Sequence, residues 1–160
     1  MVSAPSHLVL GEAVMGDAAA FAGIFLSAFL SATILPGQSE AALVALLVAK
    51  SHSVVLLLAA ASLGNILGSV ANWLLGRGIE RFRGRRFFPV SDEALRRAEG
   101  HYARWGYWSL LLSFAPVIGD PLTMIAGVLR EPFWRFLLLV SISKIGRYLV
   151  LAWLTLRWTA

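Results

Sequence analysis

Two apolar segments of this chain, residues 52–76 and 132–157, are long enough to cross a lipid bilayer as helices. A helix rises about 1.5 Å per residue and the hydrocarbon core is about 30 Å thick, so about 20 residues suffice. Only 14% of the residues are charged, compared with about 25% in soluble domains. We therefore expect an all-α integral membrane protein with a single membrane domain, residues 1–160.

Two further apolar runs, 41–49 and 122–129, are too short to cross the bilayer, and each follows a break in the chain. Proline interrupts a regular helix, and glycine permits a turn. Irregular backbone within a membrane is tolerated only where protein or water satisfies it. Each break, with the arms on either side, therefore predicts a re-entrant helical hairpin. The break residues are Pro36 and Gly37 in the first hairpin and Pro116, Gly119 and Pro121 in the second.

A shift of 80 residues aligns the two parts of the chain, placing Glu40 on Asp120 and Lys50 on Arg130. Each part then consists of an apolar arm, a break with a carboxylate, a short arm, a basic residue and a full span. If each hairpin enters and leaves on one side, each part crosses the membrane once. The pattern thus predicts an inverted repeat, in which matching broken helices are typical of transporter binding sites.

The predicted halves, about 18–77 and 106–157, are joined by a basic linker, 78–105. Residues 77–104 contain eight arginines and four acidic residues, whereas residues 1–49 contain no Lys or Arg. By the positive-inside rule, the linker is predicted to be cytoplasmic. Its second part has the amphipathic pattern of an interfacial helix. Nucleic-acid binding is the other interpretation of the basic cluster, and the apolar segments on both sides disfavour it.

Four ionisable residues lie in apolar surroundings: Glu40, Asp120, Lys144 and Arg147. A charge at the centre of a membrane helix costs about 2.5–3.5 kcal/mol on insertion scales, which marks such residues as candidates for function. Lys144 and Arg147 are three residues apart and share a helix face. Asn65 lies at the matching depth of the other span. Two acids and two bases are therefore expected to pair across the bundle.

These charges have two interpretations. In the structural one, buried ion pairs only lock the hairpins to the spans, since such pairs are often neutral for stability and can serve specificity. In the functional one, they form a polar cavity for an anionic head group, with a carboxylate as proton carrier. Burial disfavours an ionised carboxylate and a nearby cation favours it, and the sequence leaves that balance open.

Other chemistry has little support in the sequence. The three histidines, His7, His52 and His101, have no metal-binding spacing, and the chain has no cysteine, so neither a metal nor another cofactor is expected. The stretch "IGDP" resembles half of an intramembrane aspartyl protease motif, but the preceding glycine and a second buried aspartate are missing. The chain is not expected to be an enzyme, and a membrane enzyme is the weakest alternative.

Three stretches resemble the DedA family, also called the SNARE-associated or VTT domain, and in particular its short bacterial YqaA-like branch. "LPGQSE" (35–40) and "APVIGDPLTMIAG" (115–127) resemble the two re-entrant segments of the family. "GNILGSVANWLLGR" (64–77) is similar to its glycine-rich span, and "SKIGRY" (143–148) to the "GKALRY"-like residues of the short branch. The resemblance covers about residues 20–157.

The resemblance implies a multi-pass protein of the bacterial inner membrane with facing re-entrant hairpins. Members are implicated in moving or scrambling polar lipids, including phospholipids and polyprenyl phosphates, and some depend on the proton gradient. The broader family commonly has arginines where Ser113 and Gly119 stand and an acid where Ser69 stands. The cations of this chain are therefore expected to have moved to Lys144 and Arg147.

Together these observations predict a transporter or scramblase for an anionic lipid, either a phospholipid or a polyprenyl phosphate. Glu40 and Asp120 are the expected protonatable groups, Lys144 and Arg147 the head-group clamps, and Asn65 a further polar residue of the site. The main alternative is a non-transporting scaffold or assembly factor with structural charges. The expected partners are membrane lipids rather than nucleic acid. Proton coupling and homo-oligomer formation stay open.

Overall fold

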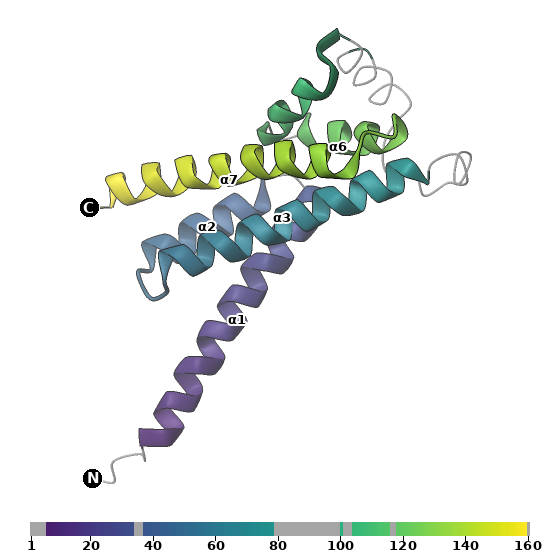
Figure 1. Ribbon diagram of the computed structural model, residues 1–160. Coiled ribbons are helices and arrows are strands. Elements are labelled where there is room, and N and C mark those ends of the chain that lie inside the picture. Colours follow the sequence, from purple (N-terminus) through teal and green to yellow (C-terminus); the bar gives the residue numbers. More distant parts are fainter. Residues whose placement is uncertain (1–5, 34–36, 79–99, 101–103, 116–117, 160) are drawn as a thin grey trace.

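The computed structural model describes residues 6–33, 37–78, 100, 104–115 and 118–159, and within them all regular structure is helical (Figure 1). Three helices are long and apolar enough to cross a membrane. They are α1 (Ser6–Thr33), through its residues 16–33, α3 (Val54–Arg77) and α7 (Phe133–Trp158). The shorter elements are α2 (Gln38–Val48), the 3₁₀ helix η1 (Gly106–Phe114) and α6 (Gly119–Val128). The all-α membrane class predicted from the sequence is confirmed.

Helix α1 is longer than the apolar stretch at residues 18–35, with which the first predicted half begins. Helix α1 begins at Ser6 and ends at Thr33, because the residues before position 18 include strong helix formers such as leucine, alanine, methionine and glutamate. The polar residues Glu12 and Asp17, which limit the apolar run, do not interrupt helical hydrogen bonding. The described part of the chain thus contains three helices of membrane length, one more than the two long apolar segments of the sequence.

The other predicted elements lie close to their expected places. The arm before the second break is the 3₁₀ helix η1, which begins at Gly106 with its left-handed φ of 59° and gives way to extended backbone at Ala115. Runs of 3₁₀ helix longer than three or four residues are uncommon, so this nine-residue element is unusually long. Most of the basic linker 78–105, with its predicted interfacial helix, and the prolines Pro36 and Pro116 lie outside the described residues.

Helices α3 and α7 run antiparallel through the whole bundle (Figure 1). From the middle, α2 runs toward the end where α3 begins, and α6 runs toward the opposite end, where α7 begins. Two apolar clusters result. One joins α1, α2, the first half of α3 and the end of α7. The other joins η1, α6, the end of α3 and the beginning of α7. Each pair of arms therefore packs on both spans, but at opposite ends.

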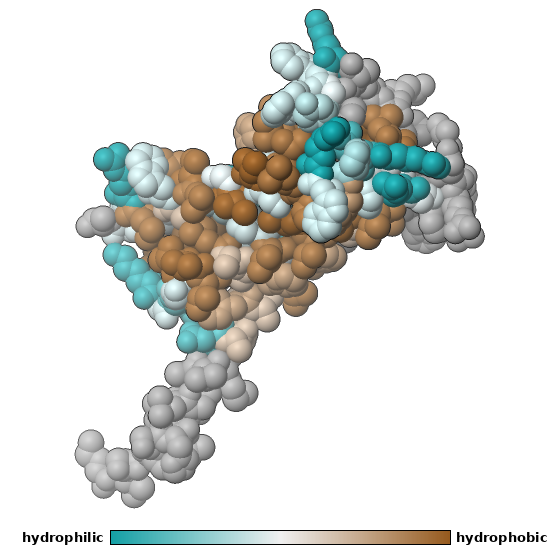
Figure 2. Space-filling model, viewed as in Figure 1, coloured by the Kyte–Doolittle hydropathy of each residue, from teal (hydrophilic) through white to brown (hydrophobic). Residues whose placement is uncertain are grey.

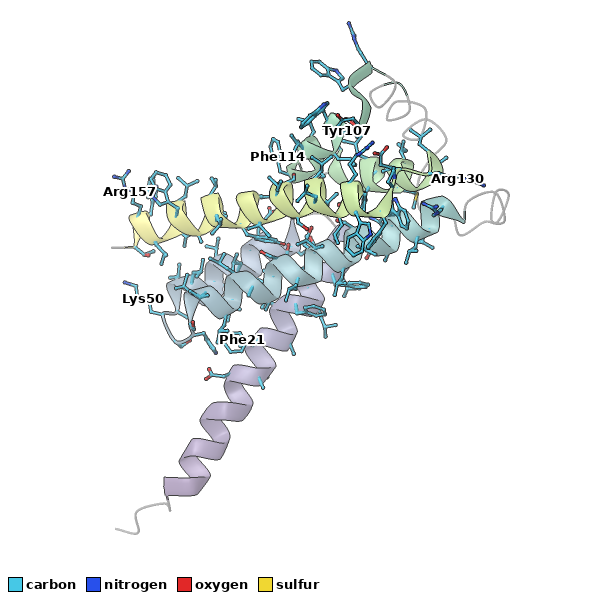
Figure 3. All side chains as sticks on the ribbon, viewed as in Figure 1. Phe21, Lys50, Tyr107, Phe114, Arg130 and Arg157 are labelled. Atoms are coloured by element: carbon cyan, nitrogen blue, oxygen red, sulfur yellow. The ribbon has the colours of Figure 1, made fainter. Side chains whose placement is uncertain are left out.

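Basic side chains lie at both ends of the bundle. Lys50 and Arg157 lie at one end and Arg130 at the other (Figure 3). Apolar residues cover the middle of the visible face between them (Figure 2). Lys50 and Arg130, which the 80-residue shift aligns, also share an unusual backbone, with left-handed φ values of 52° and 57° directly after their short helices. The same chain reversal therefore ends both α2 and α6.

Close backbone contact between helices depends on glycine. A Cβ atom added at Gly76 of α3 would collide with the carbonyl oxygen of Met124, and one at Gly127 of α6 would collide with that of Trp73. Where α3 crosses α1, Gly64 is equally close to a carbonyl of α1. Small residues allow such close approach between membrane helices, and these contacts fix where α1 and α6 lie along α3.

We expect Gly127→Ala to lower the free energy of unfolding by about 1–3 kcal/mol, because the added methyl group meets backbone that cannot rotate away. The matched control is Gly146→Ala, since a Cβ atom there meets nothing within 4 Å. Alanine is also the better helix former by up to about 1 kcal/mol, so this variant should be as stable as wild type or more so. Thermal unfolding in detergent compares the two. Equal stability of the variants would contradict the close crossing.

Candidate functional site

The middle of α7 carries the stretch "SKIGRY", residues 143–148, and four of its side chains contact four other elements. Ser143 Oγ donates a hydrogen bond to the carbonyl of Leu111 in η1 at 2.9 Å. Lys144 contacts α6, Arg147 contacts α2, and Tyr148 contacts both α2 and α3. This stretch therefore joins the two pairs of arms.

Lys144 and Asp120 form the first ion pair, with 3.1 Å between Lys144 Nζ and Asp120 Oδ1. Asp120 lies in the first turn of α6, where the helix dipole favours a negative charge. The two partners differ in burial, because the Lys144 side chain is 2% exposed and that of Asp120 is 21% exposed. The Lys144 ammonium group is thus enclosed by protein, whereas the Asp120 carboxylate is partly exposed at the surface of the bundle.

Arg147 and Glu40 form the second ion pair. Glu40 lies in the first turn of α2, the position that corresponds to Asp120 in α6. Both partners are partly open, with the Arg147 side chain 17% and the Glu40 side chain 27% exposed. A guanidinium can bind a carboxylate or a phosphate through two parallel hydrogen bonds. A phosphate group of a ligand can therefore take the place of the Glu40 carboxylate on the Arg147 guanidinium.

A neutral hydrogen-bond chain lies beside the second ion pair. The Tyr148 hydroxyl is 3.0 Å from Ser39 Oγ of α2 and accepts a hydrogen bond of 3.1 Å from Asn65 Nδ2 of α3. Asn65 Nδ2 also donates to the carbonyl of Ala28 in α1 at 3.2 Å. Asn65 Oδ1 is buried without a hydrogen-bond partner among the described residues.

A second asparagine on α3 repeats this arrangement two turns further along. Asn72 Nδ2 donates to the carbonyl of Ala32 in α1 at 2.8 Å and lies 3.4 Å from Thr123 Oγ1 of α6. Thr123 Oγ1 in turn donates to the carbonyl of Asp120 at 2.7 Å. Each asparagine thus joins α1 to an element of the second half of the chain.

The structure brings together all five polar residues predicted from the sequence. Glu40, Asp120, Lys144 and Arg147 form two pairs on one turn of α7, and Asn65 joins them through Tyr148. The sequence analysis missed Tyr148 and Asn72. Tyr148 directly follows Arg147, and Asn72 lies seven residues after Asn65 on the same helix face, so helical spacing could have identified both.

The described break residues lie at the starts of the short helices. Gly37 precedes α2 with a φ of 98°, which favours glycine. Pro121 lies in the first turn of α6, where a missing backbone N–H is tolerated. Gly119 packs so closely that a Cβ atom would collide with the carbonyl of Ser113. An arginine therefore does not fit at position 119 without movement of η1, and the cation that pairs with the neighbouring Asp120 comes from α7.

These features define a class of protein: a helical integral membrane protein with ionisable side chains paired in the middle of its bundle. Among the described residues, no three His, Cys, Asp or Glu side chains gather as a metal site would require. Acid–base pairs of this kind can exchange partners, bind a proton or bind an anion.

Comparison with known proteins shows the family. A family model of the VTT domain matches residues 35–156. Inner membrane protein YqaA of Escherichia coli (strain K12) is 39% identical over 141 residues, which cover 86% of this chain and 92% of the relative. A protein of Haemophilus influenzae is 37% identical over 139 residues, which cover 82% of this chain and 85% of the relative. No solved structure is significantly similar.

The chain therefore belongs to the VTT-domain, or DedA, family and is similar to its YqaA-like members. It is a multi-pass protein of the bacterial inner membrane, as its helices of membrane length and its relatives indicate.

Proposed function

We propose that this protein moves an anionic lipid, a phospholipid or a polyprenyl phosphate, across the inner membrane as a transporter or scramblase. The observation that carries the proposal is the arrangement on α7, where one turn holds two cations, each paired with the acid that begins a short helix. Ionisable residues inside membrane bundles are expensive and mark substrate or proton pathways. The proposal assigns no enzymatic activity to the chain.

The proposed architecture is an inverted repeat within one membrane domain, with halves 18–77 and 106–157 and a cytoplasmic linker 78–105. In each half a re-entrant hairpin, α1–α2 or η1–α6, enters and leaves on one side. Three observations support it. The short helices run from the middle to opposite ends, each hairpin packs at its own end of both spans, and Lys50 and Arg130 reverse the chain alike.

The proposed chemistry is an exchange of partners around Arg147. A proton binds the Glu40 carboxylate and neutralises it, so that the Arg147 guanidinium becomes available to the phosphate of a lipid head group. Release of the proton restores the carboxylate, which competes with the phosphate for the guanidinium. Asp120 and Lys144 are the second acid and cation of the site. Because Lys144 is enclosed by protein, Arg147 is the first contact of the head group.

The alternative function is a membrane scaffold in which both ion pairs only hold the arms to α7. The partial exposure of Glu40, Asp120 and Arg147 favours the lipid-moving function. A pair that only locks the fold has no need of access from the surface, whereas a working pair must be reached by a proton and a head group.

Reconstitution separates the two functions. Purified protein in liposomes that contain a fluorescent phospholipid or a fluorescent polyprenyl phosphate should raise the rate at which an impermeant quencher reaches the inner-leaflet label. Protein-free liposomes and liposomes with an unrelated membrane protein give the background. Failure to move either lipid, at several values of external pH and with a proton gradient, would support the scaffold.

The topology predicts the labelling of single cysteines, which is clean because the chain has no cysteine. Ser91→Cys in the linker should react with an impermeant maleimide only after the membrane is opened, since the arginine-rich side is cytoplasmic. Ser51→Cys, in the exposed turn between α2 and α3, should react from outside in intact cells. Gly37→Cys at the hairpin tip should react slowly from both sides. Labelling of residue 91 from outside alone would overturn the topology.

A further inference from the structure

We infer that Tyr148 and Ser39 are positioning residues that hold the beginning of α2 in place while the Glu40–Arg147 pair opens and closes. The inference deepens the proposed function, on which its relevance to lipid movement rests. It concerns the neutral contact beside the ion pair, to which the sequence analysis assigned no role.

The contact between α2 and α7 has two points that lie next to each other on both helices. Ser39 directly precedes Glu40 on α2, and Arg147 directly precedes Tyr148 on α7. One point is the charged pair Glu40–Arg147, and the other is the hydrogen bond between Ser39 Oγ and the Tyr148 hydroxyl, at 3.0 Å. Opening of one point therefore leaves the other to keep the two helices together.

The neutral point is the more deeply buried of the two. Tyr148 is 1% exposed and Ser39 is 1% exposed, whereas the charged partners are partly open. The Tyr148 hydroxyl accepts a hydrogen bond from Asn65 Nδ2, which leaves its own hydrogen available for Ser39 Oγ. Asn65 is itself held to the carbonyl of Ala28. The hydroxyl is thus fixed by α3 and α1, and a proton or head group that reaches Arg147 does not have to disturb it.

The hydrogen bond between Ser39 and Tyr148 holds the beginning of α2 in one place while Arg147 exchanges partners. When Arg147 leaves Glu40 for a phosphate, the charged contact no longer holds the beginning of α2. With Ser39 still bound to Tyr148, Glu40 stays within reach and the pair can form again after release. Without that bond, each opening also frees α2, and reformation of the pair becomes slower. The other ionisable groups around this site are Lys144 and Asp120, which are bound to each other.

The test is hydrogen–deuterium exchange of the full-length protein in nanodiscs. Tyr148→Phe and Ser39→Ala both remove the hydrogen bond between Ser39 Oγ and the Tyr148 hydroxyl, which should shift the local opening equilibrium about fivefold. Tyr148→Phe also removes the bond from Asn65 Nδ2, which keeps its bond to the carbonyl of Ala28. We expect the amides of α2, residues 38–48, to exchange about five times faster in both variants and in the double variant alike. The amides of α6, residues 119–128, should keep their wild-type rate. Ser39→Thr retains the hydroxyl and should restore slow exchange.

The matched control is Tyr107→Phe, which removes the same hydroxyl from an exposed tyrosine of η1 and should leave the exchange of α2 unchanged. Equal acceleration in α2 and α6 would mean that Tyr148 only stabilises the bundle, and unchanged exchange of α2 would mean that the bond does not hold it. Either result overturns the inference. The readout requires no lipid movement, so it stands even if the wild-type protein moves no lipid and the proposed function fails.

The same variants, reconstituted in liposomes, give the functional readout, which is the rate of lipid movement. Tyr148→Phe and Ser39→Ala should slow lipid movement about fivefold, in proportion to the faster exchange of α2, and Ser39→Thr should restore the rate. Wild-type rates in Tyr148→Phe together with fast exchange of α2 would show that a fixed α2 is not needed for the reaction, and would also overturn the positioning role.

Discussion

Arg147→Ala is expected to reduce lipid movement at least about a hundredfold, the largest effect of any single substitution in this chain. The substitution removes the proposed head-group clamp and leaves Glu40, which is 27% exposed, without its cation. Removal of one partner of a buried pair lowers the free energy of unfolding by about 3–5 kcal/mol. Because this pair is partly exposed, the loss should be smaller. Arg147→Lys should retain only part of the rate, because an ammonium group lacks the planar fork that binds a phosphate in two places.

A double variant separates the functional from the structural role of this pair. Glu40→Gln together with Arg147→Met removes both charges and keeps side chains of similar size, so stability should return toward that of wild type. If Arg147 binds the head group, the double variant inserts and unfolds like wild type but moves no lipid. Recovery of lipid movement in the double variant would show that the pair only holds α2 to α7. Rates from quencher access and thermal unfolding in detergent are the two measurements.

The carboxylates are expected to show the second largest effect. Glu40→Gln and Asp120→Asn should each reduce lipid movement at least about tenfold and remove its dependence on external pH, since an amide neither binds nor releases a proton at these pH values. Exchange of one acid for the other, Glu40→Asp or Asp120→Glu, should retain part of the rate and of the pH dependence. The measurement is the rate against external pH in each variant.

The two amide variants should differ in stability. Asp120→Asn leaves the enclosed ammonium of Lys144 without a counter-charge, whereas Glu40→Gln leaves a guanidinium that is partly open. A charge without a partner is more costly where water is excluded, so Asp120→Asn should be the less stable variant. If both amide variants keep the wild-type rate and pH profile, the carboxylates are not proton carriers and the breaks before α2 and α6 serve the architecture alone.

Much of the architecture could be predicted from the lengths of the apolar segments and from the proline and glycine breaks between them. The spans 52–76 and 132–157 appear as α3 and α7, and the runs 41–49 and 122–129 as the short helices α2 and α6, with ends that differ by a few residues. These segments are defined by apolar length and by breaks, which are properties of the sequence itself. Helix α1 begins at Ser6, before the apolar stretch 18–35, because helix formation follows backbone hydrogen bonding and propensity rather than the limit of an apolar run.

The site could be predicted only in part. Four charges in an apolar chain are conspicuous, and the spacing of Lys144 and Arg147 places them on one face. Which acid each cation binds depends on how far along α7 the two pairs of arms dock, and helical spacing does not carry that information. Tyr148 was missed because an aromatic residue on a membrane helix is ordinary until its hydroxyl is seen between Ser39 and Asn65.

The glycines of α3 make the two halves of the proposed repeat chemically unequal. The 80-residue shift places Lys144 on Gly64 and Tyr148 on Gly68. In α3 these positions press on the backbone of α1, where any side chain would collide, while in α7 they carry a charge and a hydroxyl. Two identical inverted halves would alternate between states related by a two-fold axis, and those states would have equal free energy. Under the proposed repeat and an alternating mechanism, these halves do not exchange roles. States open to opposite sides of the membrane should then differ in free energy, and the resting population should favour one side even without a gradient.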